Sequence, residues 1–325
     1  MKKIAVFGAG TMGAGIAQTY AMQDYEVFLY SRTQKTLDRA RQVIEAGLAL
    51  FAEEGLIEEE NARRTAERLH YTTCGEEAAQ GAWYVAETIA EREEEKRALY
   101  QTLDRLLPDE AILASNTSYL NIFQLVPEGR QERTVIAHWI APAHIVPLVE
   151  VVCGPKTSEE TMDRVMQLHT RCGKLPVRME RYVPGFIINR LQSAMTREVL
   201  YLLEQGYCTP ETLDLAVKAS LMPRGLLLGV VQRMDFNGLD VVAHGLENQT
   251  YTPAPAPEED NIIARHYRAG ELGVKSGTGF YDYRGRSYQE VLEGRDRQLI
   301  QSVRLARAFL DHPLADPLKN EEHRA

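Results

Sequence analysis

The sequence of 325 residues contains only four cysteines, which lie far apart and include no C-x-x-C pair. Isolated cysteines of this kind are typical of free thiols in a reducing compartment. We therefore expect no disulfide framework, and a cytoplasmic location is the default expectation. The sequence predicts no metal site either.

An excess of positive charge and long apolar runs are also lacking. There are 37 Lys and Arg against 46 Asp and Glu, a formal net charge of -9, which argues against nucleic acid as a partner. No apolar run approaches the roughly 18 residues of a membrane span, and the N-terminus does not have the layout of a signal peptide. With 44% hydrophobic and 26% charged residues, the composition is ordinary for a globular enzyme, and the length suggests two domains.

The most informative pattern lies near the N-terminus. A short apolar run at 3–7 enters the turn GAGTMG at 8–13, and an amphipathic stretch and a second apolar run follow. This order predicts strand, glycine turn, helix and strand, the context in which G-x-G-x-x-G marks a dinucleotide site. Gly8 would allow the tight turn, Gly10 would let a pyrophosphate approach, and Gly13 would let the helix pack closely on the strand. The alternative is a glycine turn in an unliganded α/β protein. The candidate cofactor-binding residues here are Gly8, Gly10, Thr11, Met12 and Gly13.

Apolar runs alternate with helical patterns over the first half of the chain, which predicts an α/β fold with a doubly wound, mostly parallel sheet. A charged region at about 36–69, broken at Gly55, is predicted as a helical insertion between strands. The further strand-like runs are 83–86, 111–114, 134–137, 148–152 and 175–179.

A turn signal at 183–186 marks the predicted boundary between two domains. We expect a dinucleotide-binding domain at 1–183 and, because the apolar spacing then becomes helical, a smaller all-helical domain at 184–283. Residues 284–325 are expected to form a helical extension with a frayed tail. Its helix at 288–310 has an apolar stripe that would pack on its own domain or on a second subunit.

Ligands of an open α/β sheet bind outside the carboxyl ends of its strands, so the residues that follow each strand belong together. His138 ends one apolar strand, and Glu150 lies in the next apolar run. A carboxylate can hold a histidine in one tautomer and support its protonated form while the histidine exchanges a proton with a hydroxyl. The alternative is a histidine of the core. The other strand-end segments are the glycine turn, 31–32, 87–91 and 115–118.

Several motifs together resemble the 3-hydroxyacyl-CoA dehydrogenase family, from Met1 to about Tyr283. They are GAGTMGAGIA at 8–17, ASNTS at 114–118, His138 with proline four residues later, PLVEVV at 147–152, GKLPV at 173–177, VPGFIINR at 183–190, MDFNGLD at 234–240 and GVKSGTGFYDY at 273–283.

The resemblance implies a Rossmann domain, a helical domain that also forms a homodimer, and an enzyme of fatty acid metabolism. Such an enzyme transfers a hydride between a nicotinamide cofactor and the 3-hydroxy or 3-oxo group of an acyl-CoA. His138 would be the acid/base and Glu150 its partner. Ser118 and Asn189 would hydrogen-bond the reacting oxygen or the histidine, although Asn189 has a simpler alternative as a helix cap.

On the cofactor side, the resemblance implies that Glu91 lies near the nicotinamide ribose and Lys96 near the nicotinamide end, and Asn116 is a further candidate. The family usually has an aspartate, which binds the ribose hydroxyls of NAD, where this chain has Ser31. Without that carboxylate a 2′-phosphate is no longer repelled, and Arg32 could pair with it. We hypothesise that the enzyme accepts NADP; otherwise Arg32 stacks on adenine or faces water.

Two further departures bear on the substrate. Family members that act on acyl-CoA usually have asparagine at the position of Ala141, and their helical insertion tends to be basic. Here the insertion is acidic at 53–60, with Arg63 and Arg64 its only adjacent positive pair. The run at 145–148 is similar to relatives that oxidise free hydroxy acids, such as gulonate or carnitine dehydrogenases. The alternatives are therefore a free hydroxy acid or diketone, or a catalytically inactive nucleotide-binding relative.

Overall fold

The computed structural model describes residues 2–248, 252–310 and 314, and the chain divides into two compact units, 1–190 and 191–325. The tail that the sequence predicts to be frayed lies, apart from Leu314, outside the described residues. No helix in the described part of the chain is long and apolar enough to cross a membrane.

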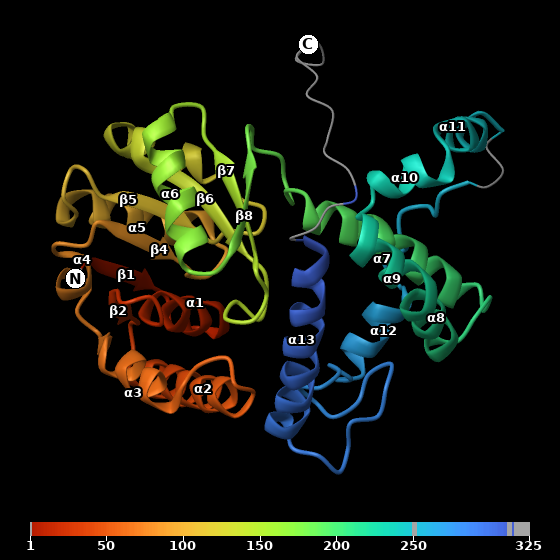
Figure 1. Ribbon diagram of the computed structural model, residues 1–325, viewed down its shortest axis with the longest axis horizontal. Helices are drawn as coiled ribbons and strands as arrows, with labels where there is room; N and C mark the ends of the chain where they lie inside the picture. Colours follow the sequence, from red (N-terminus) through yellow and green to blue (C-terminus); the bar gives the residue numbers. More distant parts are fainter. Residues whose placement is uncertain (1, 249–251, 311–313, 315–325) are drawn as a thin grey trace. The chain divides into compact units, whose positions relative to one another are not determined.

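The first unit is built on one eight-stranded sheet (Figure 1). Its strand order is β3-β2-β1-β4-β5-β6-β7-β8, and every neighbouring pair is parallel except β6 and β7. The predicted doubly wound, mostly parallel sheet is confirmed. The strands are β1 (Lys3–Phe7), β2 (Glu26–Tyr30), β3 (Leu69–Thr72), β4 (Tyr84–Glu87), β5 (Ile112–Ser115), β6 (Thr134–Trp139), β7 (Leu148–Cys153) and β8 (Leu175–Met179).

Helices cover both faces of this sheet. Residues of the predicted helical insertion form two helices, and the turn between them contains Gly55 at a φ of 65°. The helices of the first unit are α1 (Thr11–Ala21), α2 (Gln34–Glu53), α3 (Glu59–Glu67), α4 (Gly75–Ala79), α5 (Glu93–Leu106) and α6 (Glu159–Arg171), with 3-10 turns at Ile122–Gln124 and Glu128–Arg133.

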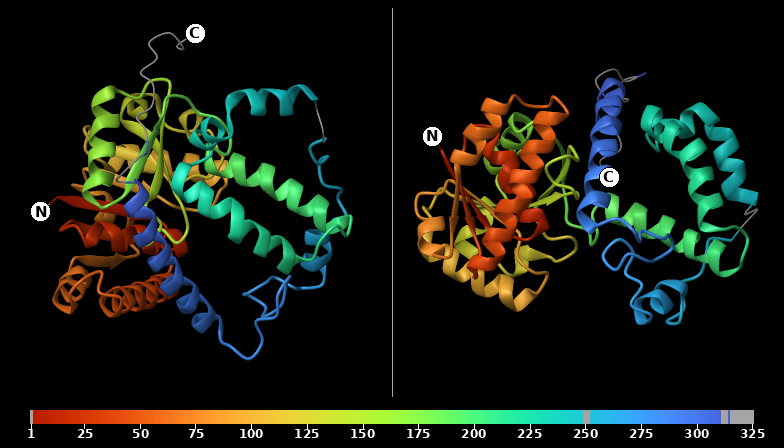
Figure 2. Two further views of the ribbon diagram at one scale, coloured as in Figure 1. Left: turned by 45° about the vertical axis from the view of Figure 1, so that its right-hand side comes forward. Right: turned by 90° about the horizontal axis from the view of Figure 1, so that it is seen from below.

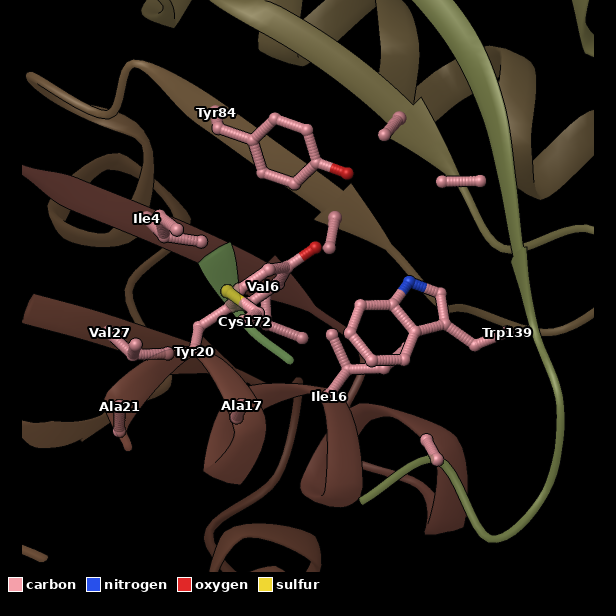
Figure 3. Close-up of a cluster of buried hydrophobic side chains, with 14 of the residues drawn as sticks. Ile4, Val6, Ile16, Ala17, Tyr20, Ala21, Val27, Tyr84, Trp139 and Cys172 are labelled. Carbon is pink, nitrogen blue, oxygen red and sulfur yellow. The ribbon is translucent and has the colours of Figure 1, made fainter. Parts of the chain in front are cut away.

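Strand β1 shows why both faces are covered. Ile4 and Val6 pack into one apolar cluster with α1, α2 and α6, whereas Ala5 and Phe7 pack into a second cluster with α4 and α5. Successive side chains of a strand point to opposite faces, so an uninterrupted apolar run requires cover on both. Figure 3 shows the first cluster around Tyr20 of α1, whose ring centroid lies 5.5 Å from that of Trp139.

The described elements of the second unit are helices, apart from isolated bridges at Gly273–Thr278 and Thr278–Asp282 (Figure 2). The predicted all-helical C-terminal region is confirmed. Helix α7 (Ile188–Glu204) begins in the first unit. The others are α8 (Pro210–Ala216), α9 (Met222–Leu228), α10 (Gln232–Asn237), α11 (Leu239–Asn248), α12 (Ile262–Arg268) and α13 (Tyr288–Leu310), with a π-helical stretch at Val217–Leu221.

Candidate active site

The glycine turn joins β1 to α1 at the carboxyl edge of the sheet. Gly8 has a φ of 114°, a conformation that L side chains rarely adopt. A Cβ atom on Gly13 would lie 1.8 Å from the carbonyl oxygen of Gly8. Glycine at 13 therefore lets the helix approach the strand, and the hydroxyl of Thr88 fixes the turn by donating to the Gly8 oxygen at 2.8 Å.

Gly10 has a different environment, because a Cβ atom there would meet nothing within 4 Å. It is the N-cap residue of α1, and no side chain caps that helix end, so Thr11 and Met12 start the helix with backbone N–H groups available for an anion. The open space and the uncapped helix end fit the pyrophosphate of a dinucleotide.

The two residues that follow β2 are Ser31 and Arg32, a cation without an adjacent carboxylate. Ser31 is buried, and its N–H donates to the carbonyl oxygen of Thr72 at 3.2 Å. The Arg32 side chain is 81% exposed and lies 3.8 Å from a Glu95 carboxylate oxygen. An exposed ion pair of that length stabilises little, so the guanidinium can turn toward a ligand at small cost.

The end of β4 carries a buried ionic cluster that contains two of the predicted residues. Lys96 is fully buried, and its Nζ lies 2.7 Å from Glu87 Oε1 and 3.3 Å from Glu91 Oε2. Glu87 lies in one of the strand-end segments of the sequence analysis, but its role was not predicted. The signal that could have identified it is a carboxylate that ends an otherwise apolar buried strand.

Glu91 connects this cluster to the end of β5. Its Oε1 accepts hydrogen bonds from the Thr117 hydroxyl at 2.5 Å and the Ser118 N–H at 2.6 Å. Burial raises the pKa of Glu91, but the Thr117 hydroxyl, the Lys96 ammonium and the Ser118 N–H together lower it below its ordinary value. Glu91 is therefore held as a carboxylate.

The polar residues after β5 are connected to β6 and α7. Asn116 Oδ1 accepts the Trp139 N–H at 2.8 Å, next to His138. The Asn189 side-chain amide donates to the Ser118 carbonyl oxygen at 3.4 Å. The structure thus brings Asn189, which is 71 positions from Ser118 in the sequence, to the sheet edge where Asn116 and Ser118 lie.

His138 and Glu150 are opposite each other in the antiparallel pair β6–β7, and His138 Nδ1 lies 2.9 Å from Glu150 Oε2. Both residues are buried. The Glu150 Oε1 accepts the N–H groups of Ile187 and Ile188 at 2.8 and 3.1 Å, at the start of α7. With Nδ1 bonded to a carboxylate, Nε2 is the nitrogen that can exchange a proton with a substrate.

The charge of Glu150 depends on these contacts. Burial raises the pKa of Glu150, but the hydrogen bonds from His138 and from the N–H groups of Ile187 and Ile188 lower it below its ordinary value. The carboxylate is therefore ionised and can stabilise a protonated imidazole. A buried acid/base pair at the sheet edge that also carries an open, uncapped glycine turn is an arrangement suited to hydride transfer coupled to proton transfer.

Comparison with known proteins gives matches over both units. A family model described as 3-hydroxyacyl-CoA dehydrogenase, NAD binding domain, matches residues 3–182, and one described as 3-hydroxyacyl-CoA dehydrogenase, C-terminal domain, matches residues 185–283. A probable 3-hydroxybutyryl-CoA dehydrogenase of Bacillus subtilis (strain 168) is 36% identical over 291 residues, 87% of this chain and 98% of that protein.

Two solved structures are also similar. The crystal structure of 5-formyl-3-hydroxy-2-methylpyridine 4-carboxylic acid 5-dehydrogenase, described as an NAD+-dependent dismutase, has a TM-score of 0.84 and 29% identity, and the match covers 94% of this chain and 99% of that one. The 3-hydroxybutyryl-CoA dehydrogenase of Escherichia coli K12 has a TM-score of 0.68 and 31% identity, and the match covers 88% of this chain and 60% of that one.

Proposed function

The chain belongs to the 3-hydroxyacyl-CoA dehydrogenase family, and we propose that it transfers a hydride between a nicotinamide cofactor and the 3-hydroxy or 3-oxo group of an acyl-CoA. The observation that carries this proposal is the buried pair of His138 and Glu150 at the sheet edge that also holds the open glycine turn. The family establishes a dehydrogenase acting on CH–OH with an NAD-binding domain; the acyl-CoA substrate is the proposed part.

In the oxidative direction, His138 Nε2 accepts the hydroxyl proton of the substrate. Glu150 stabilises the imidazolium that forms, because its carboxylate is fixed 2.9 Å from Nδ1. Ser118 and Asn189 position the reacting oxygen. A bound nicotinamide cofactor would supply the hydride acceptor, and the glycine turn and the first N–H groups of α1 would hold its pyrophosphate.

We also propose that the cofactor can be NADP as well as NAD. The support is local: Ser31 lies where the family usually has an aspartate, and the exposed Arg32 guanidinium forms a 3.8 Å pair with Glu95. Ser31→Asp should lower kcat/KM for NADPH by roughly 10²-fold, since like charges placed together cost several kcal/mol, and should spare NADH.

The cofactor test uses kcat/KM for both nucleotides. Arg32→Ala should lower the value for NADPH alone, and Arg39→Ala, which removes an exposed arginine farther along α2, is the matched control. A wild-type enzyme with a large preference for NADH would overturn the NADP proposal.

A second substrate class has specific support. The structure of the pyridine-carboxylate dehydrogenase matches this chain with a TM-score of 0.84, against 0.68 for the Escherichia coli 3-hydroxybutyryl-CoA dehydrogenase. In the insertion, Arg63 and Arg64 both pair with Glu60, at 2.6 and 3.2 Å, so one of their two charges is compensated. The alternative proposal is therefore the same reaction on a free carboxylic acid rather than a CoA ester.

One assay distinguishes these proposals. Oxidation of NADH and NADPH is followed with acetoacetyl-CoA, with free acetoacetate and with 5-formyl-3-hydroxy-2-methylpyridine 4-carboxylate. Turnover of the CoA ester alone supports the acyl-CoA proposal, and turnover of a free acid alone supports the alternative. His138→Gln should lower kcat by about 10²-fold or more. Cofactor binding without turnover of any of the three would favour a nucleotide-binding protein without this activity.

We further propose a cytoplasmic homodimer. Support for the location comes from the four thiols, none of which is in a disulfide within the described residues. Support for the dimer comes from the apolar side chains that the second unit exposes.

A further inference from the structure

Lys96 is enclosed by two carboxylates. The side chain is fully buried, and its Nζ donates to both oxygens of Glu87, at 2.7 and 2.9 Å. Glu91 Oε2 completes the contacts at 3.3 Å. Lys96 therefore affects the site through these two acids, the Glu87–Lys96–Glu91 cluster.

Glu87 fixes the position of that ammonium group. It is fully buried at the end of β4 and accepts hydrogen bonds from four residues. The donors are the Lys96 ammonium, the hydroxyls of Tyr100 and Ser115 at 2.6 Å each, and the Ile89 N–H at 2.8 Å. A carboxylate with both oxygens bonded in this way cannot turn toward a ligand.

Glu91 is the member of the cluster that reaches the reaction site. Its Oε1 bonds the N–H groups of Ser118 and Tyr119, at 2.6 and 3.3 Å, and the Thr117 hydroxyl. An ionised carboxylate accepts these bonds more strongly than a neutral carboxyl does, and the Lys96 ammonium on its other oxygen favours the ionised state. The backbone of Ser118 is thus held through Glu91.

We propose that Glu87 and Lys96 are positioning residues, which keep Glu91 ionised and oriented so that Glu91 fixes the backbone of Ser118 at the reacting oxygen. The catalytic consequence rests on the proposed function, whereas the contact between Glu91 and Ser118 does not.

The decisive variant is Lys96→Met, which removes the cation and keeps an apolar chain of similar length. Burial then raises the pKa of Glu91, so that the carboxyl is protonated as the pH falls and holds the Ser118 N–H more weakly. We expect kcat to fall by up to about 10²-fold at pH 6, the effect of a small misplacement in an active site, and to recover toward pH 9. Loss of packing alone would lower activity equally at all pH values.

A double-mutant cycle separates an indirect role from cofactor contact. Glu91→Gln should lower kcat without the pH dependence, and Lys96→Met combined with Glu91→Gln should be no worse than Glu91→Gln alone. Additive losses would overturn the inference, because Lys96 would then act independently of Glu91. Glu91→Gln also keeps the test decisive if Lys96→Met does not fold, because an unchanged kcat in Glu91→Gln contradicts the inference by itself.

Arg130→Met is the matched control, because Arg130 is a buried cation that bonds the Ala111 carbonyl oxygen at the opposite edge of the sheet. It should lower thermal stability with no change in the pH profile of kcat. The amide resonance of Ser118 is recorded on the same samples, since it reports the Glu91 contact without turnover. A Ser118 amide that shifts with pH in Lys96→Met but not in wild type supports the inference even if the proposed substrates fail; no difference overturns it.

Discussion

His138 and Glu150 are separated by 12 positions in the chain and are bonded because β6 and β7 run antiparallel. Residues opposite each other in such a pair have adjacent side chains on one face of the sheet. The second oxygen of Glu150 is bonded to the start of α7. One buried carboxylate thus joins the acid/base to the helix that carries Asn189.

Replacing Glu150 by glutamine should have two effects. The kcat should fall by about 10²-fold, because the imidazolium loses its anionic partner. The free energy of unfolding should fall by about 2 kcal/mol at neutral pH, the value of hydrogen bonds to a charged group. The lowered pKa of Glu150 stabilises the fold above its ordinary value of 4.5, and this contribution is lost as the pH falls through the lower pKa of the folded state.

The measurement is the thermal unfolding of wild type and Glu150→Gln from pH 8 to pH 3.5. The difference in midpoint should be constant above about pH 5 and shrink below it. Glu110→Gln, at an exposed position, is the control. A difference that persists unchanged at the acid end would mean that Glu150 stabilises the fold by packing, not by charge.

The sequence could predict His138 and Glu150 because each is a polar residue set in an apolar run. It could not predict that Lys96 is buried, since a lysine after Glu93, Glu94 and Glu95 has the pattern of a solvated helix face. Nor could it predict the contacts of Glu150 with the start of α7. Those depend on the turn at Gly185 and Phe186, both of which have a positive φ, and a buried phenylalanine gives no signal for that conformation.

At the scale of elements, Gly10 and Gly13 have separable roles. Gly10→Ala should cost less than about 1 kcal/mol of stability, the small loss of a glycine N-cap, yet weaken NADH binding, because its methyl group enters the space left for the pyrophosphate. Gly13→Ala should cost about 3 kcal/mol, because its Cβ collides with a backbone oxygen that cannot move alone.

Differential scanning fluorimetry of the two cofactor-free variants, followed by NADH titration, checks this prediction. Gly10→Ala should unfold near the wild-type temperature and bind NADH weakly, and Gly13→Ala should lose both stability and binding. Equal destabilisation by the two substitutions would contradict separate roles, and normal NADH binding by Gly10→Ala would contradict the position assigned to the pyrophosphate.

The elements themselves were predictable where the signal is local. The strand, glycine turn and helix at the N-terminus, the break at Gly55 and the last helix at 288–310 follow from periodicity and glycine position. Strand β3 was not predicted, because Leu69–Thr72 begins where the predicted helical insertion ends and forms no apolar run of its own. The antiparallel direction of β7 depends on the path of the chain between strands, which periodicity does not report.

At the scale of the whole molecule, the two units differ in how much apolar surface they bury. The first has two continuous apolar clusters, one on each face of its sheet. Within 191–310, the described apolar residues that are fully buried are Leu200, Ala254 and Ile300. Helices α9, α10 and α11 and the residues between them instead expose large apolar side chains, among them Val231, the N-cap residue of α10, at 69% and Phe236 of α10 at 63%. Such surface on a folded chain marks an interaction site.

A second copy of the chain is the partner we expect for this surface, since most oligomers are symmetric dimers of identical chains. Light scattering after gel filtration should give twice the chain mass of 36.7 kDa. Val231→Glu and Phe236→Glu should each shift the mass toward the monomer, because an interface cannot bury an unpaired carboxylate without a large penalty. Val43→Glu introduces the same charge at an exposed apolar position of α2 in the first unit and should leave the mass unchanged. A monomeric wild type, or a dimer that tolerates both substitutions in the second unit, would show that these helices do not form the interface.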